Sequence, residues 1–164
     1  DAEDGRPHND YGAGAALTRG VLPFQARGNA MAAGNDLLIV GVDDDPKSLV
    51  LLKRIVESGG YSFVGVSSGK ELLEVLKTKK PRIILMDIMM PGMNGFETSL
   101  RVRTGFPDRA CAIIYVTARQ GEEDLRGGVA AGGNDFVLKP INREKLLSRI
   151  EKWIGRVHTI KTAV

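Results

Sequence analysis

The sequence predicts an α/β fold in which helices cover both faces of a parallel sheet. Three observations lead to this prediction: short apolar runs recur after residue 36, an amphipathic segment follows each run, and no repeat of fixed period is present. Strands that alternate with helices form parallel sheets through right-handed crossovers. We therefore expect a doubly wound five-stranded parallel sheet with five helices, in a single domain that spans residues 36–157.

Proline and glycine mark the helix boundaries in the first half of this domain. Pro46 lies where proline is favoured, in the first turn of a helix, and Gly59 and Gly60 end that helix. Pro81 follows the second helix, and the run after it is almost entirely apolar, as expected for a strand with both faces covered. The expected elements are strands at 37–42, 61–66 and 82–86 and helices that begin at Pro46 and at Ser68 or Gly69.

The second half of the domain contains three further helices and two strands. Asn142 is a favourable N-cap for the last helix. Gly127 and Gly128 fall inside the preceding helix, and each glycine costs a helix about 1 kcal/mol relative to alanine. We therefore hypothesise that this preceding helix is unusually mobile. The expected elements are helices from Gly95 to about residue 103, at 122–131 and after Asn142, and strands at 112–116 and 136–138.

The first 35 residues differ in composition from the rest of the chain. They are rich in glycine and alanine and show no sustained hydrophobic period. Such a segment buries too little apolar surface to offset the entropy that it loses on ordering. We predict that residues 1–35 form a flexible tail or linker and that residues 158–164 form a short C-terminal tail.

Composition excludes several classes of protein. The net charge of +3 comes from 23 basic and 20 acidic residues that are interleaved along the chain, so we expect a mixed, solvated surface and no direct nucleic-acid binding. No window approaches the roughly 18 apolar residues of a membrane span, and we expect no membrane association. Because Cys111 is the single cysteine, no internal disulfide can form, and we expect a cytoplasmic protein.

Side chains that can hold a cation or a phosphate follow four of the predicted strands. In doubly wound folds, ligands bind outside the carboxyl ends of the strands, so these side chains are expected to meet there. Three carboxylates in one place repel one another unless a hard cation is bound, and Mg²⁺ prefers oxygen ligands. The residues are Asp43, Asp44 and Asp45 after the first strand, Asp87 after the third, Thr117 at the end of the fourth and Lys139 after the fifth.

Lysine and threonine add the groups that a phosphoryl oxygen needs. Lys139 supplies a point charge, and the Thr117 hydroxyl can donate a hydrogen bond. The set therefore predicts a metal-assisted phosphoryl site with a carboxylate nucleophile. The alternative is purely structural: residues 43–45 form a solvated turn, and Asp45 is the N-cap of the helix that begins at Pro46.

Four motifs in order resemble the receiver domains of two-component signalling, and the chain is similar to the chemotaxis response regulators. The motifs are LIVGVDDDP (38–46), LMDIMMPGMNGFE (85–97), IIYVTA (113–118) and NDFVLKP (134–140). The resemblance covers residues 36–157. It implies a flavodoxin-like strand order of 2-1-3-4-5 and a phosphoprotein that acts in a phosphorelay.

The resemblance also assigns roles at the predicted site. It implies that Asp87 accepts a phosphoryl group from a sensor histidine kinase or a phosphotransfer protein. It implies that Asp43, Asp44 and Asp87 hold Mg²⁺, with Asp44 in direct contact, and that the backbone carbonyl of Met89 is a further ligand.

The remaining roles that the resemblance implies concern the response to phosphorylation. Thr117 would hydrogen-bond the phosphoryl group, and Lys139 would form an ion pair with it. Thr117 and Phe136 would then act as switch residues that reshape the surface of the fourth helix, fifth strand and fifth helix. A cis peptide is implied between Lys139 and Pro140. Signals of this kind pass to an output domain or protein, and homodimerisation stays open.

Two other functions use related features. A haloacid-dehalogenase-type enzyme also has a strand-end aspartate, a threonine and a lysine with Mg²⁺, but it needs a second aspartate two residues after the nucleophile, where Met89 stands. A flavin-phosphate-binding module needs a phosphate-cradling loop of glycine, serine and threonine after the first strand, which this chain lacks. We therefore expect a signalling domain and no enzyme, beyond self-catalysed phosphotransfer and autodephosphorylation.

Overall fold

A computed structural model of the chain describes residues 37–107, 111–118 and 121–161, with side chains described to residue 156. The predicted tail at 1–35 lies outside the described residues, as do residues 162–164 of the predicted C-terminal tail. At these positions the two tails therefore stay predictions.

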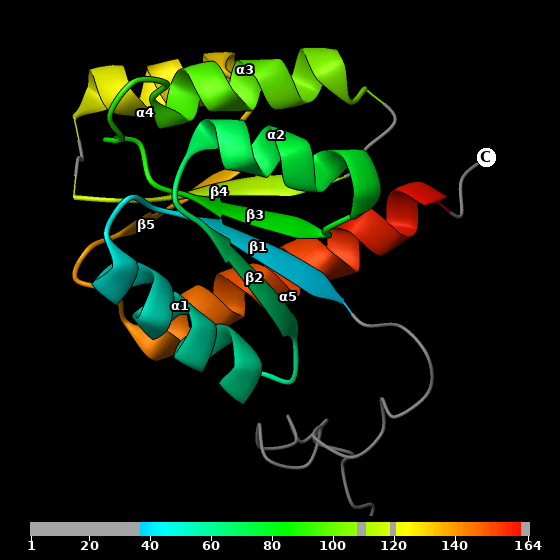
Figure 1. Cartoon of the computed structure of the whole chain (residues 1–164). Helices are drawn as coiled ribbons and strands as arrows, with labels where there is room; N and C mark the ends of the chain where they lie inside the picture. Colours follow the sequence, from blue (N-terminus) through cyan, green and yellow to red (C-terminus); the bar gives the residue numbers. More distant parts are fainter. Residues whose placement is uncertain (1–36, 108–110, 119–120, 162–164) are drawn as a thin grey trace, which may run out of the picture. The chain divides into compact units, whose positions relative to one another are not determined.

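A five-stranded parallel sheet forms the centre of the domain (Figure 1). Its strand order, β2-β1-β3-β4-β5, is the predicted one. Each strand begins and ends within one residue of its expected bounds, because the apolar runs themselves define the buried segments. The strands are β1 (Leu38–Val42), β2 (Ser62–Val66), β3 (Ile83–Met86), β4 (Ala112–Thr117) and β5 (Asp135–Leu138).

Helices cover both faces of this sheet: α1 and α5 lie on one face, and α2, α3 and α4 lie on the other (Figure 1). The doubly wound prediction is confirmed. Most helix bounds agree with the expected ones, whereas α5 continues to Lys161, past the predicted end of the domain at residue 157. The helices are α1 (Pro46–Ser58), α2 (Gly69–Thr78), α3 (Gly95–Gly105), α4 (Glu122–Ala130) and α5 (Arg143–Lys161).

Side-chain caps fix where four of the helices begin. The side chains of Asp45, Ser68 and Asn94 accept hydrogen bonds from backbone N–H groups in the first turns of α1, α2 and α3. The Asn142 side chain does the same for Lys145 in α5, at 2.9 Å. A cap of this kind stabilises a helix by about 1 kcal/mol. Because the caps lie immediately after strands or short loops, they keep the connections at the carboxyl ends of the strands short.

Two apolar clusters hold the layers together. One includes Ile39, Leu85 and Ile114 of the sheet with Leu52 of α1 and Leu146 of α5. The other lies on the opposite face, beneath α2, α3 and α4. It contains Val40, Ile84, Met86 and Tyr115 of the sheet together with Leu72, Leu76 and Val102 of the helices.

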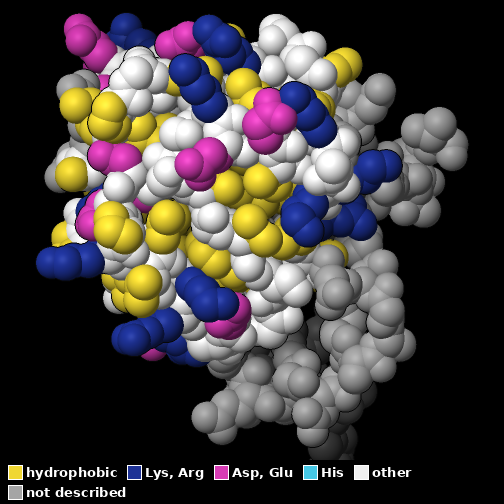
Figure 2. All heavy atoms as spheres, viewed as in Figure 1, with side chains coloured by type: hydrophobic (Ala, Val, Ile, Leu, Met, Phe, Trp, Pro, Cys, Tyr) yellow, Lys and Arg dark blue, Asp and Glu magenta, His cyan; other side chains and the backbone are white. Residues whose placement is uncertain are grey.

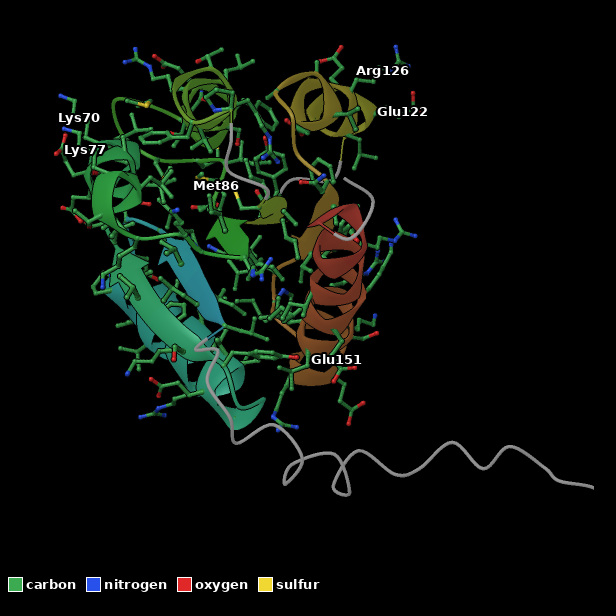
Figure 3. The ribbon with its side chains drawn as sticks, turned by 90° about the vertical axis from the view of Figure 1, so that its right-hand side faces the viewer. Lys70, Lys77, Met86, Glu122, Arg126 and Glu151 are labelled. Carbon is green, nitrogen blue, oxygen red and sulfur yellow. The ribbon has the colours of Figure 1, made fainter. Side chains whose placement is uncertain are left out.

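The surface carries a mixture of charges. Figure 2 shows basic and acidic side chains interspersed over one face of the domain. Figure 3 shows that Lys70 and Lys77 of α2 and Glu122 and Arg126 of α4 point away from the protein, whereas Met86 lies inside it. Within the described ranges, no helix combines the length and the apolar character needed to cross a membrane.

Candidate functional site

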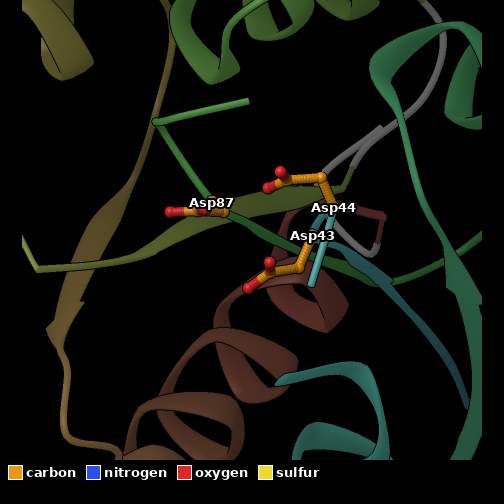
Figure 4. A group of neighbouring side chains, drawn as sticks. All are labelled: Asp43, Asp44 and Asp87. Atoms are coloured by element: carbon orange, nitrogen blue, oxygen red, sulfur yellow. The ribbon is translucent and has the colours of Figure 1, made fainter. Parts of the chain in front are cut away.

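Three carboxylates meet at the carboxyl ends of β1 and β3 (Figure 4). Asp43 follows the last residue of β1, and Asp87 follows the last residue of β3; these last residues, Val42 and Met86, are paired in the sheet. One ligand oxygen from each of Asp43, Asp44 and Asp87 lies within 4.8 Å of the other two. Asp43 and Asp87 are buried, at 1% and 8% exposure, whereas Asp44 is exposed. The cluster therefore opens to solvent on the side of Asp44.

Backbone hydrogen bonds fix the two buried carboxylates. The Asp43 N–H donates to the Val66 carbonyl at 3.2 Å, and the Asp87 N–H donates to the Val42 carbonyl at 2.9 Å. These bonds extend the sheet ladder by one residue beyond β1 and β3. One carboxylate oxygen of Asp43 also accepts the Asp45 N–H at 2.9 Å. The sheet therefore fixes the main chain of Asp43 and Asp87, and the Asp43 carboxylate is held as well.

Lys139 reaches the same cluster from the end of β5. Its Nζ donates to Asp43 Oδ2 at 2.8 Å and lies 3.8 Å from Asp87 Oδ2. Its backbone N–H donates to the Thr117 carbonyl at 2.9 Å, which ties the end of β5 to the end of β4. The Lys139–Pro140 peptide is cis, as the resemblance implies. Among the described residues, the Lys139 ammonium group is thus the positive charge beside the acidic cluster.

The environment shifts the pKa values of Asp87 and Lys139. Burial raises the pKa of Asp87, and the charge of Asp43 raises it further, although Lys139 and the backbone N–H groups of Met89 and Ile88 oppose the shift. Burial alone would lower the pKa of Lys139, but the hydrogen bond to Asp43 and the charges of Asp87 and Asp43 outweigh burial and raise it. The raised pKa means that the ionised form of Asp87 is not fully stabilised by its surroundings. Lys139 stays protonated at neutral pH.

Thr117 and Phe136 lie on neighbouring strands, two rows of the sheet apart. Thr117 is 1% exposed and pairs with Leu138, whereas Phe136 pairs with Tyr115 and is half-buried. The Phe136 and Tyr115 rings pack with centroids 5.1 Å apart. Because residues two apart on a strand share a face, Tyr115 and Thr117 point to the same side of the sheet. Tyr115 therefore lies on the same face of β4 as Thr117 and packs against Phe136.

Sequence reasoning did not identify a positioning role for Gly95. A Cβ at Gly95 would overlap the backbone carbonyl of Asp87, so only glycine lets α3 begin so close to the Asp87 loop. The Gly95 N–H donates to the Ile88 carbonyl at 2.9 Å, which closes this loop. A glycine directly after the N-cap Asn94, where most residues favour a helix more strongly, was the available signal.

The fold and these side chains define a parallel α/β domain with an acidic site and a lysine at the carboxyl ends of its strands. Oxygen ligands beside one ammonium group can hold a hard cation and an anionic group next to each other. The sequence matches the response regulator receiver domain family over residues 39–151. The chain belongs to this family, whose members are signalling domains of two-component systems and are not classical enzymes.

Individual relatives agree with this assignment. The chain is similar to the transcriptional regulatory protein YvrH of Bacillus subtilis, at 34% identity over 124 residues, which are 75% of this chain and 51% of YvrH. It is also similar to protein PilH of Pseudomonas aeruginosa, at 32% identity over 112 residues, which are 68% of this chain and 93% of PilH. The chain thus spans about half the length of YvrH and nearly all of PilH.

A solved structure supports the same fold. The CheY-like response regulator receiver domain protein of Methanospirillum hungatei superimposes with a TM-score of 0.71 at 26% identity. The match covers 76% of this chain and 98% of that protein. The aligned region therefore corresponds to one complete receiver domain.

Proposed function

We propose that this domain is a phosphoacceptor, in which Asp87 receives a phosphoryl group from a phosphohistidine of a partner protein. A carboxylate oxygen of Asp87 attacks the phosphorus, the phosphorus–nitrogen bond breaks, and the leaving imidazole keeps the electron pair and takes up a proton. The observation that carries this proposal is the convergence of Asp43, Asp44, Asp87 and Lys139 at one edge of the sheet. Phosphoryl transfer depends chiefly on positioning and charge stabilisation, and this group of side chains supplies both.

The donor set fits Mg²⁺. Asp43, Asp44 and Asp87 offer carboxylate oxygens within 4.8 Å of one another, and Asp44 is open to solvent, where the retained waters of Mg²⁺ would lie. The Met89 carbonyl, from the loop that follows Asp87, is proposed as a further ligand. Bound there, Mg²⁺ would neutralise charge on the phosphoryl oxygens.

Phosphorylation then changes the charge at Asp87. The group adds about −1.5 to −2 charges and three acceptor oxygens. Lys139, whose Nζ is already 3.8 Å from Asp87, forms an ion pair with these oxygens, and the Thr117 hydroxyl donates a hydrogen bond to one of them. Two charge-assisted hydrogen bonds of about 1.5–3 kcal/mol each approach the roughly 5.5 kcal/mol that moves a two-state equilibrium from 1:99 to 99:1.

The conformational response passes from Thr117 to Phe136 and reshapes the surface of α4, β5 and α5. Among the described side chains of this region, three large apolar ones are exposed: Leu125 and Val129 on α4 and Leu138 on β5. An exposed apolar group of this kind suits contact with a downstream output domain, an output protein or a second copy of the chain. We propose a sensor histidine kinase or a phosphotransfer protein as the phosphoryl donor, and a cytoplasmic location for the exchange.

Intact-protein mass measurement tests the phosphoacceptor assignment. After incubation with Mg²⁺ and acetyl phosphate, we expect the wild-type protein to gain one phosphoryl group and the Asp87→Asn variant to gain none. The matched control is Asp45→Asn, which changes a neighbouring carboxylate outside the cluster and keeps a side-chain oxygen for the α1 cap. Equal labelling of Asp87→Asn and wild type would refute the assignment.

A further inference from the structure

Three aromatic rings from three separate elements pack in a row beneath α3 and α4. Phe96 comes from the first turn of α3, Tyr115 from β4 and Phe136 from β5. The Tyr115 ring meets Phe96 edge to face at a centroid distance of 5.3 Å and meets Phe136 at 5.1 Å. Tyr115 is fully buried and occupies the middle of the row. The predicted switch residue Phe136 is therefore linked to α3 through Tyr115.

Two glycines bring α4 against the same rings. A Cβ at Gly127 would lie 3.1 Å from the Phe96 ring, and a Cβ at Gly128 would overlap the Phe136 ring and lie 2.9 Å from the Tyr115 ring. Any other residue at position 128 would push α4 or Phe136 away. The paired glycines thus allow a close approach between α4 and the aromatic row, which gives their presence in the middle of a helix a physical reason.

The Tyr115 hydroxyl faces acceptors on both helices. It donates to Ser99 Oγ of α3 at 2.8 Å, and the Gly128 carbonyl of α4 lies at 3.5 Å. The hydroxyl has one proton, so it can satisfy only one of these acceptors fully at a time. Each of the two groups keeps another hydrogen bond when this proton points away from it: Ser99 Oγ donates to the Gly95 carbonyl at 2.8 Å, and the Gly128 carbonyl accepts the Gly133 N–H at 2.9 Å. The proton can therefore change partners without leaving a buried group unsatisfied.

The same hydrogen bonds continue to the acidic site. Gly95 donates its N–H to the Ile88 carbonyl, next to Asp87. A hydrogen-bonded path thus runs from the Asp87 loop through Gly95, Ser99 and Tyr115 toward α4. This path starts from the Asp87 loop and not from Thr117, and it meets the proposed Thr117–Phe136 route at Tyr115, which packs on Phe136.

We propose that Tyr115 is a positioning residue that couples α3 to α4, so that α3 takes part in the phosphorylation response. When α4 moves toward β4, the distance between the Tyr115 hydroxyl and the Gly128 carbonyl shortens from 3.5 Å. The Tyr115 hydroxyl then donates its proton to the Gly128 carbonyl in place of Ser99 Oγ. As a result, α3 loses its hydrogen bond to β4. The exposed face of α3, which carries Leu100 at 49% exposure, then belongs to the surface that changes. The inference rests on the proposed phosphorylation of Asp87.

Hydrogen exchange of the whole 164-residue chain tests the coupling. Peptides that cover α3 and α4 are measured before and after treatment with Mg²⁺ and acetyl phosphate. In wild-type protein we expect exchange to change in both helices. In Tyr115→Phe, which removes only the hydroxyl, we expect the same phosphoryl mass gain and a retained change in α4, but no change in α3. A purely structural role would alter exchange before phosphorylation and leave the α3 response in place.

Two further variants control this experiment. Ser99→Ala removes the α3 acceptor of the Tyr115 hydrogen bond but keeps the tyrosine, so it must also abolish the α3 response. If Tyr115→Phe fails to fold, Ser99→Ala replaces it as the test variant. Tyr61→Phe removes a hydroxyl from a half-buried tyrosine that packs on the opposite face of the sheet and must leave both responses intact.

The outcomes separate this inference from the proposed function. An α3 response that persists in Tyr115→Phe and Ser99→Ala, or that is absent from phosphorylated wild-type protein, overturns the coupling but leaves the phosphoacceptor assignment standing. Absence of the phosphoryl mass from wild-type protein overturns both.

Discussion

Lys139 Nζ lies 2.8 Å from Asp43 Oδ2 at the carboxyl end of the sheet, although 96 positions separate the two residues in the sequence. Asp43 is 1% exposed, so few water molecules can replace this donor. The ion pair therefore connects β1 to the end of β5 and offsets part of the repulsion within the acidic cluster.

Removal of the Lys139 charge is expected to destabilise the metal-free protein. Lys139→Met keeps most of the side-chain volume but leaves the buried Asp43 oxygen without its donor. A lost partner of this kind costs about 1–3 kcal/mol, and the measurement is the free energy of unfolding in urea with EDTA present. The control is Lys77→Met, which breaks an exposed pair with Glu74 worth less than about 1 kcal/mol. Equal losses in the two variants would contradict the role of the Lys139–Asp43 pair.

Addition of Mg²⁺ is expected to raise the melting temperature, because the metal would bind the folded cluster and relieve the repulsion among its carboxylates. At a concentration 100 times its dissociation constant, a ligand specific for the folded state adds about 2.7 kcal/mol to the free energy of unfolding. Thermal scans with Mg²⁺ and then with excess EDTA measure the shift and its reversal.

Two carboxylate variants control the Mg²⁺ experiment. Asp44→Asn removes a proposed ligand that is exposed and is expected to reduce the shift, whereas Asp45→Asn is expected to keep it. A melting temperature that does not respond to Mg²⁺ in the wild-type protein would argue against the metal site.

Apolar runs and strand-end residues carried most of the information that the sequence held. They predicted the parallel sheet and its two helical layers, and they placed Asp43, Asp87 and Lys139 at one edge, because parallel strands bring their carboxyl ends together. The strand order came from the resemblance to receiver domains. The Tyr115–Ser99 hydrogen bond could not be predicted in this way. It depends on the distance and rotation between α3 and β4, which periodicity alone does not determine. The roles of the site residues in phosphoryl transfer stay predictions.

A set of part-buried arginine contacts also could not be predicted from the sequence. The Arg103 guanidinium of α3 donates to the carbonyls of Gly132 and Cys111 at 2.8–3.0 Å and to Asn134 Oδ1 at 2.9 Å. Its three partners lie before β4 and β5, and no local pattern connects them to residue 103. The acceptors match the planar fork of a guanidinium, which lysine cannot reproduce.

Arg103→Lys is therefore expected to lower the free energy of unfolding by about 1–3 kcal/mol, because one ammonium group cannot satisfy all of these acceptors. Urea unfolding measures this difference. Arg101→Lys is the matched control, since Arg101 forms an exposed pair with Glu97 on the same helix and its replacement is expected to cost less than about 0.5 kcal/mol. A loss in Arg103→Lys no larger than in the control would show that the guanidinium contacts do not stabilise the fold.

The hypothesis that α4 is unusually mobile is tested by native-state amide exchange. Gly127 and Gly128 weaken the helix, and its N-cap, Gly121, has no side chain with which to accept a hydrogen bond. We expect the amides of α4 to exchange faster than those of α5, which is capped by Asn142. Equal protection of the two helices would mean that close packing on the aromatic row compensates for the glycines.

Asp135 is expected to make the protein sensitive to acid. Burial raises the pKa of this carboxyl, but hydrogen bonds from Trp153 Nε1, the Phe136 N–H and Arg149 outweigh burial and lower it. A folded pKa below the unfolded one means that Asp135 stabilises the fold fully above the unfolded value, 3.8. This contribution is lost as the pH falls from there through the folded pKa.

The Asp135→Asn variant measures this contribution. Its carboxamide still offers an oxygen to Trp153 but loses the charge that Arg149 faces at 2.7 Å, so we expect a loss of about 1–2 kcal/mol at pH 7, discounted because Arg149 is partly exposed. The difference in free energy of unfolding between wild type and variant should shrink toward pH 3, because protonation removes the wild-type charge as well. Glu151→Gln, at an exposed position on α5 (Figure 3), should give no such pH-dependent difference. A wild-type advantage that is constant from pH 7 to pH 3 would mean that the charge of Asp135 does not contribute to stability.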